Sequence, residues 1–240
     1  MCRRLYHRFS LCMILFASAL APAQQATLKA RVELTKNGRP LKDSAGAVVW
    51  LSPISGPPAE LPPQKPSEIP KLIQKDKSFH PSLVVIPVGG KVEFPNHDPF
   101  FHNVFSLFEG KRFDLGLYEG GTTRFVQFDK PGISYIFCNI HAQMSAVIVA
   151  LNTRYYAISD SRGEVRMPEV APGRYELQIF HSSVAPEQLR ALTHEITIAP
   201  GDNSIGSFTL PESGLELAHK NKYDRDYDSP NPDNPAYARP

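Results

Sequence analysis

A short loop between two apolar runs constrains the fold of this chain more than any other feature. Residues 138–144 place a thiol (Cys138), an imidazole (His141) and a thioether (Met144) at intervals of three residues. Soft sulfur ligands together with imidazole suit copper, and a trigonal set of two histidines and one cysteine with a weak axial methionine is the arrangement of electron-transfer copper sites. The loop lacks the second imidazole, so a fold that binds metal here must bring a histidine to it from elsewhere in the chain.

Residues 1–23 are predicted to be a secretory signal and not part of the fold. Three arginines within the first eight residues precede an apolar run at 11–20 and a small-x-small cleavage site, Ala21-Pro22-Ala23. The apolar run is too short to span a membrane; an uncleaved anchor or an apolar core helix is the alternative. We therefore predict an exported, periplasmic protein with no membrane span in its mature form.

Cleavage after residue 23 would change both the charge and the cysteine count. It removes three of the 26 Lys and Arg residues and none of the 24 Asp and Glu residues, so the formal charge falls from +2 to −1. This near-neutral balance gives no reason to expect binding to nucleic acid or to an anionic membrane. Cys2 and Cys12 are also removed, which leaves Cys138 as a lone thiol in an oxidising compartment. Metal ligation explains such a thiol, and a buried inert cysteine is the alternative.

The remaining chain is predicted to be all-β. Residues 24–70 contain two strand-like runs, joined at an Asn37-Gly38 turn, and a connector with seven prolines among residues 53–70. Residues 71–151 contain about eight short strand-like runs, the first at 71–79, with turns roughly every 8–12 residues, which is the pattern of an antiparallel sandwich.

The C-terminal part of the chain is predicted to contain a second β region and a tail. Residues 152–211 contain further alternating runs and one short helical turn at 186–192. Residues 212–240 are rich in charge and proline. They cannot bury a core, so we expect them to be disordered or to lie on a surface.

His102 is the candidate for the missing imidazole. It stands at the start of one predicted strand, whereas Cys138 stands at the end of another. Two such positions can meet at one end of a sandwich, and the turn after Cys138 then brings His141 and Met144 to the same point. His102, Cys138, His141 and Met144 are therefore the predicted ligands of one copper ion, cycling between Cu+ and Cu2+, per chain.

The other histidines are predicted to be structural or exposed. His97 shares a loop with Asp98, and we interpret it as a plain loop residue, with a role beside the metal or as a substitute ligand as alternatives. His80 lies beside a proline and should be exposed. His181 and His194 have no cysteine or acid at ligand spacing.

Residues 71–151 resemble the cupredoxin family, which includes plastocyanin, pseudoazurin and amicyanin. The likeness is carried by a glycine turn at Gly89-Gly90, by His102-Asn103-Val104 and by Tyr135-x-Phe137-Cys138-x2-His141-x2-Met144. It implies a Greek-key β-sandwich with the upstream ligand at His102, the thiolate at Cys138, the second imidazole at His141 and the axial thioether at Met144. It also implies that Asn103 ties the two ligand segments together. The short spacing of the loop is most similar to amicyanin.

The chain beyond residue 23 also resembles exported proteins labelled methylamine utilization or plastocyanin-like proteins. In these a β-sandwich of the carboxypeptidase-regulatory type accompanies the copper unit. Residues 24–55 look like the first half of such a sandwich and residues 152–211 like the second. The resemblance implies a copper unit inserted into a split sandwich, and two separate small β units are the alternative. The label names a pathway, and no residue here identifies an amine or its dehydrogenase.

Three functions are compatible with these residues. The first is periplasmic one-electron transfer to or from a transient redox protein, with His141 as the electron port inside an apolar patch of Pro99, Phe100, Ile140 and Ala142. The second is an exported copper carrier or storage protein, and the third is a non-redox β-sandwich scaffold with a structural metal. Four protein ligands leave no open coordination position, so we do not expect an enzyme.

Overall fold

The computed structural model describes residues 25–55, 61, 64–107, 110–213 and 220–227. The predicted signal at 1–23, parts of the proline-rich connector and parts of the tail lie outside these residues. The described chain is all-β, as predicted, with one short helix, α1 (Pro186–Ala191), and one 3-10 turn, η1 (Pro66–Glu68). Within this part of the chain no helix has both the length and the apolar character needed to cross a membrane.

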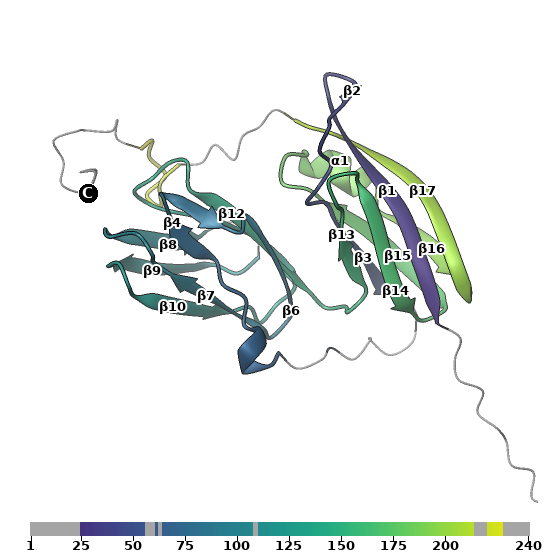
Figure 1. The fold of residues 1–240 in the computed structure, drawn as a ribbon, viewed down its shortest axis with the longest axis horizontal. Helices are drawn as coiled ribbons and strands as arrows, with labels where there is room; N and C mark the ends of the chain where they lie inside the picture. Colours follow the sequence, from purple (N-terminus) through teal and green to yellow (C-terminus); the bar gives the residue numbers. More distant parts are fainter. Residues whose placement is uncertain (1–24, 56–60, 62–63, 108–109, 214–219, 228–240) are drawn as a thin grey trace, which may run out of the picture.

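Residues 71–151, here called the central unit, form a sandwich of two β layers (Figure 1). One layer is the sheet β6-β12-β11-β8-β9, in which only the β6–β12 pair is parallel. The other is the pair β10-β7, which the β4–β5 hairpin continues through bridges from Lys71 to Glu93 and from Gln74 to Asn96. The strands are β4 (Ile73–Lys75), β5 (Ser78–His80), β6 (Leu83–Pro87), β7 (Lys91–Pro95), β8 (His102–Ser106), β9 (Phe113–Tyr118), β10 (Thr123–Gln127), β11 (Gly132–Phe137) and β12 (Ser145–Leu151).

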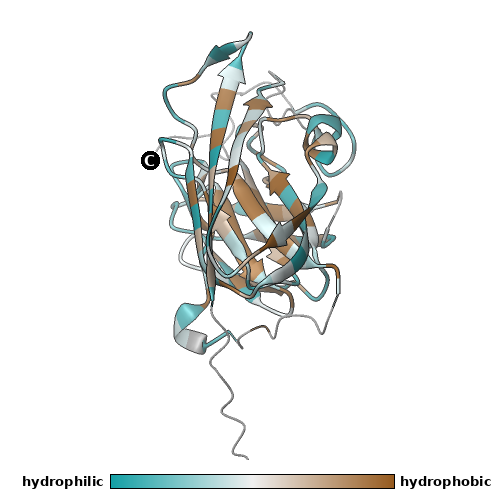
Figure 2. Cartoon of the chain, turned by 90° about the vertical axis from the view of Figure 1, so that its right-hand side faces the viewer, coloured by the Kyte–Doolittle hydropathy of each residue, from teal (hydrophilic) through white to brown (hydrophobic). Residues whose placement is uncertain are grey.

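The segments before and after the central unit pair with each other to form the flanking unit. In one sheet β1 lies between β14, which is antiparallel to it, and β17, which is parallel. In the other sheet β3 lies between β13 and β15. Figure 2 faces this unit and shows apolar and polar residues alternating along its strands. Its strands are β1 (Ala26–Lys36), β2 (Arg39–Pro40), β3 (Val48–Pro53), β13 (Tyr156–Ile158), β14 (Glu164–Val170), β15 (Gly173–Phe180), β16 (His194–Ile198) and β17 (Gly201–Pro211).

Strand β12 is buried on both faces and joins the two units. Because successive side chains of a strand point to opposite faces, Ala146, Ile148 and Ala150 enter the core between the two layers of the central unit. Val147, Val149 and Leu151 instead enter the apolar core of the flanking unit. The contact continues across the interface, where the Tyr135 and Phe180 rings lie 6.4 Å apart.

One sequence expectation is corrected by the structure. The single strand predicted at 71–79 is the β4–β5 hairpin, which turns at Asp76 (φ 54°) and Lys77 (φ 55°). Left-handed backbone is uncommon outside glycine, and no Gly or Asn marks this turn in the sequence. Residues 220–227 of the tail lie on the surface of the central unit, to which they are hydrogen-bonded; this is the second of the two alternatives given for this segment.

Candidate metal centre

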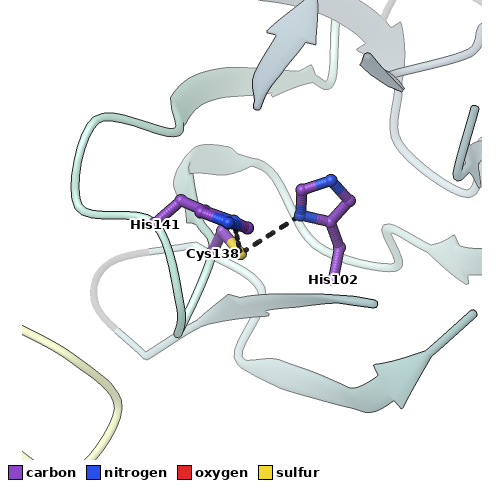
Figure 3. Close-up of side chains that lie close together, drawn as sticks. All are labelled: His102, Cys138 and His141. Atoms are coloured by element: carbon purple, nitrogen blue, oxygen red, sulfur yellow. Dashed lines mark hydrogen bonds between the residues drawn. The ribbon is translucent and has the colours of Figure 1, made fainter. Parts of the chain in front are cut away.

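Three predicted ligands converge at one end of the central unit. The Cys138 Sγ atom lies 3.7 Å from Nδ1 of His102 and 3.6 Å from Nδ1 of His141. Figure 3 shows both rings turned with Nδ1 toward the sulfur. His102 and Cys138 are fully buried and His141 is 3% exposed. Among the described residues the structure thus brings two imidazole nitrogens and one thiol sulfur together in a buried cluster.

The spacing of these atoms fits a metal ion with trigonal ligands. Metal–nitrogen bonds of about 2.0 Å and a metal–sulfur bond of about 2.3 Å, at an angle of about 120°, place nitrogen and sulfur about 3.7 Å apart. The observed separations are 3.7 and 3.6 Å. The pocket therefore needs no rearrangement of these two nitrogen–sulfur pairs to hold an ion between them.

Strand ends and a tight turn position the ligands. His102 opens β8 and Cys138 follows the last residue of β11, and the two strands pair at Phe105 and Phe137. The loop after β11 is closed by backbone hydrogen bonds from the Cys138 N–H to the Met144 carbonyl (3.3 Å) and from the Met144 N–H to the His141 carbonyl (3.0 Å). Met144 is fully buried in the same apolar core as Cys138.

Asp98 fixes the orientation of the His102 ring. Its carboxylate lies 2.7 Å from Nε2 of His102. Because a carboxylate only accepts hydrogen bonds, Nε2 carries the proton and donates, which leaves the Nδ1 lone pair facing Cys138. The same carboxylate accepts the N–H groups of Asp76 (2.7 Å) and Lys77 (3.0 Å). The left-handed β4–β5 turn therefore positions the Asp98 carboxylate, which in turn orients the His102 ring.

Burial keeps the three ligand side chains uncharged when no metal is bound. It lowers the pKa of both imidazoles, that of His141 to about 4. It raises the pKa of the Cys138 thiol, although the backbone N–H groups of Asn103, Ile140 and His141 act in the opposite direction. The imidazole nitrogens are thus available as ligands at neutral pH, and metal binding must release the thiol proton.

The other histidines that the structure describes stay outside this cluster. His97 and His80 are exposed. His181 bonds to Ser183 Oγ (2.9 Å) and to the Ala45 carbonyl (3.2 Å), and His194 to the Leu192 carbonyl (2.7 Å). In the same loop it is the Asp98 carboxylate, and not the exposed His97, that contacts the candidate ligand His102. Only the three-dimensional hairpin contact reveals it.

Aromatic and small residues surround the site on its outer side. The Phe100 ring centroid lies 5.2 Å from that of His102 and 5.8 Å from that of His141. Pro99 and Ala142 are exposed, and Phe101 is 55% exposed. His141 is therefore largely screened from solvent, and the residues in this region include a cation as well as apolar side chains, since Nζ of Lys77 lies 5.4 Å from the Phe100 ring centroid.

Gly120 supports the Asp98 loop from behind, because a Cβ at this position would lie 2.3 Å from the Asp98 carbonyl oxygen. We expect Gly120→Ala to lower the free energy of unfolding of the metal-free protein by about 2 kcal/mol, measured by urea denaturation. Gly121→Ala is the matched control, since its Cβ would meet nothing within 4 Å. Its only penalty is the strain of an alanine at a φ of +79°, which should lower the free energy of unfolding by about 1 kcal/mol. Equal stability of the two variants would contradict the close contact.

Comparison with known proteins finds similar chains among solved structures. No protein-family model matches the sequence, and no curated protein matches it. A copper-containing nitrite reductase (NirK) from Thermus scotoductus SA-01 aligns with 42% of this chain at 25% identity and a TM-score of 0.34, and the alignment spans 25% of that reductase. A purple cupredoxin from Nitrosopumilus maritimus aligns over 34% of this chain and 99% of its own, at 21% identity and a TM-score of 0.31.

A reduced mutant of amicyanin is also similar, with 15% identity and a TM-score of 0.33 over 35% of this chain and 82% of its own. In the present chain the two-layered sandwich carries one candidate ligand at the start of β8 and two in the β11–β12 loop. The central unit therefore has a cupredoxin-like fold.

Proposed function

We propose that this chain is an exported copper protein that transfers single electrons through a type 1 site of His102, Cys138, His141 and Met144, with one copper per chain. The observation that carries the proposal is that two imidazole nitrogens lie 3.7 and 3.6 Å from one thiol sulfur in a buried pocket. This donor set, with a thioether as the weak axial ligand, is the one that electron-transfer copper sites use. When bound, copper supplies the Cu(I)/Cu(II) couple.

The protein itself supplies rigidity. Asp98 fixes the His102 ring, and the two backbone hydrogen bonds of the β11–β12 loop fix Cys138 and His141 relative to each other. Burial keeps water away from the ligands. Ligands that barely move between two oxidation states require little reorganisation, which favours fast electron transfer. Four protein ligands leave no position for a substrate, so the proposed activity is not enzymatic.

The proposed partner is a transient redox protein that docks beside His141. Phe100 touches both imidazole rings, and the exposed Pro99 and Ala142 extend an apolar surface around them. Small apolar patches suit brief encounters of this kind. Export to the periplasm is proposed from the N-terminal residues alone, namely a basic start, a short apolar run and a small-x-small site.

Titration of the purified protein with Cu(II) tests the proposal. We expect an intense blue thiolate-to-copper absorption band that saturates at one copper per chain. A protein that stays colourless while its Cys138 thiol remains titratable would overturn it. A copper carrier must release its metal readily, and the burial of the ligands argues against this role. Rapid copper loss to a chelator combined with slow electron self-exchange would favour the carrier.

Met144 is proposed as the weak axial ligand, which makes the potential sensitive to its replacement. We expect Met144→Leu to keep the blue band and to raise the reduction potential, because loss of a thioether donor disfavours Cu(II). The volume hardly changes, so the stability cost should stay below about 1.5 kcal/mol. Cyclic voltammetry measures the shift. Met167→Leu, a buried methionine of β14 in the flanking unit, is the matched control and should leave the potential unchanged. A colourless Met144→Leu protein would show that Met144 is not a weak axial ligand.

A further inference from the structure

Residues 220–227, here called the strap, return from the flanking unit to the end of the central unit that carries the ligands. β17 ends at Pro211 in the flanking unit, whereas the strap lies beside the β11–β12 loop (Figure 1, yellow). Asn221, Lys222 and Tyr227 are half-buried there. A segment with no aliphatic residue gains little from apolar burial, so its polar contacts explain why it lies here.

Two of these contacts reach the ligand loop directly. The Tyr227 hydroxyl donates a hydrogen bond to the carbonyl oxygen of Cys138 at 2.6 Å. The Lys222 N–H donates to Oδ1 of Asn139 at 2.9 Å. The strap therefore grips the backbone of the ligand cysteine and the side chain of the residue after it.

A third contact reaches the other ligand segment. Nζ of Lys222 lies 2.8 Å from Oδ2 of Asp114, and Oδ1 of Asp114 accepts a hydrogen bond from Nδ2 of Asn103 at 2.6 Å. Asn103 directly follows His102, and its backbone N–H is directed at the Cys138 sulfur. Lys222, Asp114 and Asn103 thus form a chain of contacts that ends at the thiol.

The strap has an internal turn that contains Lys222 and precedes Tyr227. The Asn221 N–H donates to the Arg225 carbonyl (2.9 Å), and the Asp224 N–H donates to the Asn221 carbonyl (3.0 Å). Oδ1 of Asn221 also accepts the N–H of Tyr223 (2.9 Å). Such a turn is held by local hydrogen bonds, so Lys222 reaches the central unit from a preformed turn, and Tyr227 follows two residues after it.

We propose that Lys222 and Tyr227 are positioning residues of the metal centre. The strap holds the ligand Cys138, and Asn103 beside the ligand His102, in the positions that metal binding requires, and it slows the opening of the ligand loop through which metal leaves. It contacts the Cys138–Asn139 side of the loop. This inference rests on the proposed function, because it assigns the strap a role toward the same copper site. Groups that orient metal ligands typically change metal affinity 10- to 100-fold when removed.

The test compares variants of the full chain in which Cys2 and Cys12 are replaced by serine. Tyr227→Phe removes one hydroxyl, Lys222→Met removes the ion pair, and a chain ending at Ser213 lacks the strap. The matched controls are Tyr156→Phe, an exposed tyrosine of β13 in the flanking unit, Lys130→Met, an exposed turn lysine, and a chain ending at Tyr227. Three properties are measured: copper release to a chelator, the energy of the thiolate-to-copper band, and the reaction rate of the Cys138 thiol with a disulfide reagent in the metal-free protein.

We expect copper release to be about fivefold faster for Tyr227→Phe, the effect of one lost hydrogen bond. We expect about twofold for Lys222→Met, whose ion pair is partly exposed, and about 10- to 100-fold for the chain ending at Ser213. The band should shift in Tyr227→Phe and in the chain ending at Ser213 but in none of the controls. Thiol reactivity should rise in the same order.

Unchanged release, band energy and thiol reactivity in all three strap variants would overturn the proposal even if the full chain binds copper. If the full chain binds no copper, the proposed function fails, and the thiol reactivity of the metal-free protein still decides whether the strap closes over Cys138. If the strap merely adds stability, Tyr227→Phe should lower the unfolding temperature and leave the band energy unchanged.

Discussion

Cys138→Ser is expected to abolish the blue band of the copper-treated protein completely. The band arises from charge transfer between a thiolate and Cu(II), and Cys138 is the only cysteine in the described part of the chain. A serine hydroxyl is a hard, protonated oxygen that does not replace a thiolate as a ligand for copper. Copper affinity should also fall, because the thiolate is lost and only two imidazoles and a thioether remain as ligands. Visible absorption and electron paramagnetic resonance of the Cu(II)-treated variant measure both effects.

The control for this substitution is the fold of the metal-free protein. A buried hydroxyl in place of the thiol should cost about 1–3 kcal/mol of stability, and circular dichroism should show an unchanged β spectrum. Cys138→Ser protein that folds normally and still develops an intense blue band would show that the copper thiolate lies elsewhere.

Asp98→Ala is expected to have the second largest effect, on stability and metal affinity together. It leaves three donors without their acceptor: the N–H groups of Asp76 and Lys77, and Nε2 of His102. At about 1 kcal/mol for each hydrogen bond, the free energy of unfolding should fall by about 3 kcal/mol. The His102 ring also loses the partner that presents Nδ1 to the metal, so copper affinity should drop 10- to 100-fold.

Asp160→Ala provides a matched control for Asp98→Ala. The Asp160 carboxylate also accepts two backbone N–H groups, those of Arg162 (2.9 Å) and Glu164 (2.8 Å), but in the flanking unit and without a histidine. This variant should lose some stability and bind copper normally. Urea denaturation and competition with a copper chelator separate the two effects. Normal copper affinity in Asp98→Ala would mean that the orientation of His102 does not depend on the carboxylate.

The ligands that meet in the structure could be predicted from sequence because their spacing is local or set by strand ends. Cys138 and His141 lie three residues apart in one turn, and His102 opens a strand that pairs beside β11. Alternation also predicted strands such as β1 and β15, in which mainly one face is buried. Asp98 could not be assigned, because its role depends on a turn at Asp76 and Lys77 whose left-handed backbone no glycine announces.

The strap could not be predicted for a different physical reason. Composition indicates whether a segment can bury a core, and residues 220–227 cannot. Their position depends instead on single hydrogen bonds and one ion pair from Lys222 and Tyr227 to residues far away in the sequence. Such contacts leave no periodic pattern in the chain.

The pairing of β3 with β13 has a consequence for folding kinetics. Trp50 and Tyr156 are partners in this antiparallel pair. The two strands therefore form a hairpin of the flanking unit whose connecting segment contains the whole central unit. Loop-closure entropy grows only with the logarithm of loop length, which makes a connection of roughly a hundred residues tolerable. If the central unit folds first, its compact form brings the ends of β3 and β13 close together and reduces that entropy further. Slow pairing of β3 with β13, following rapid burial of the β12 core, is then the expected order of events.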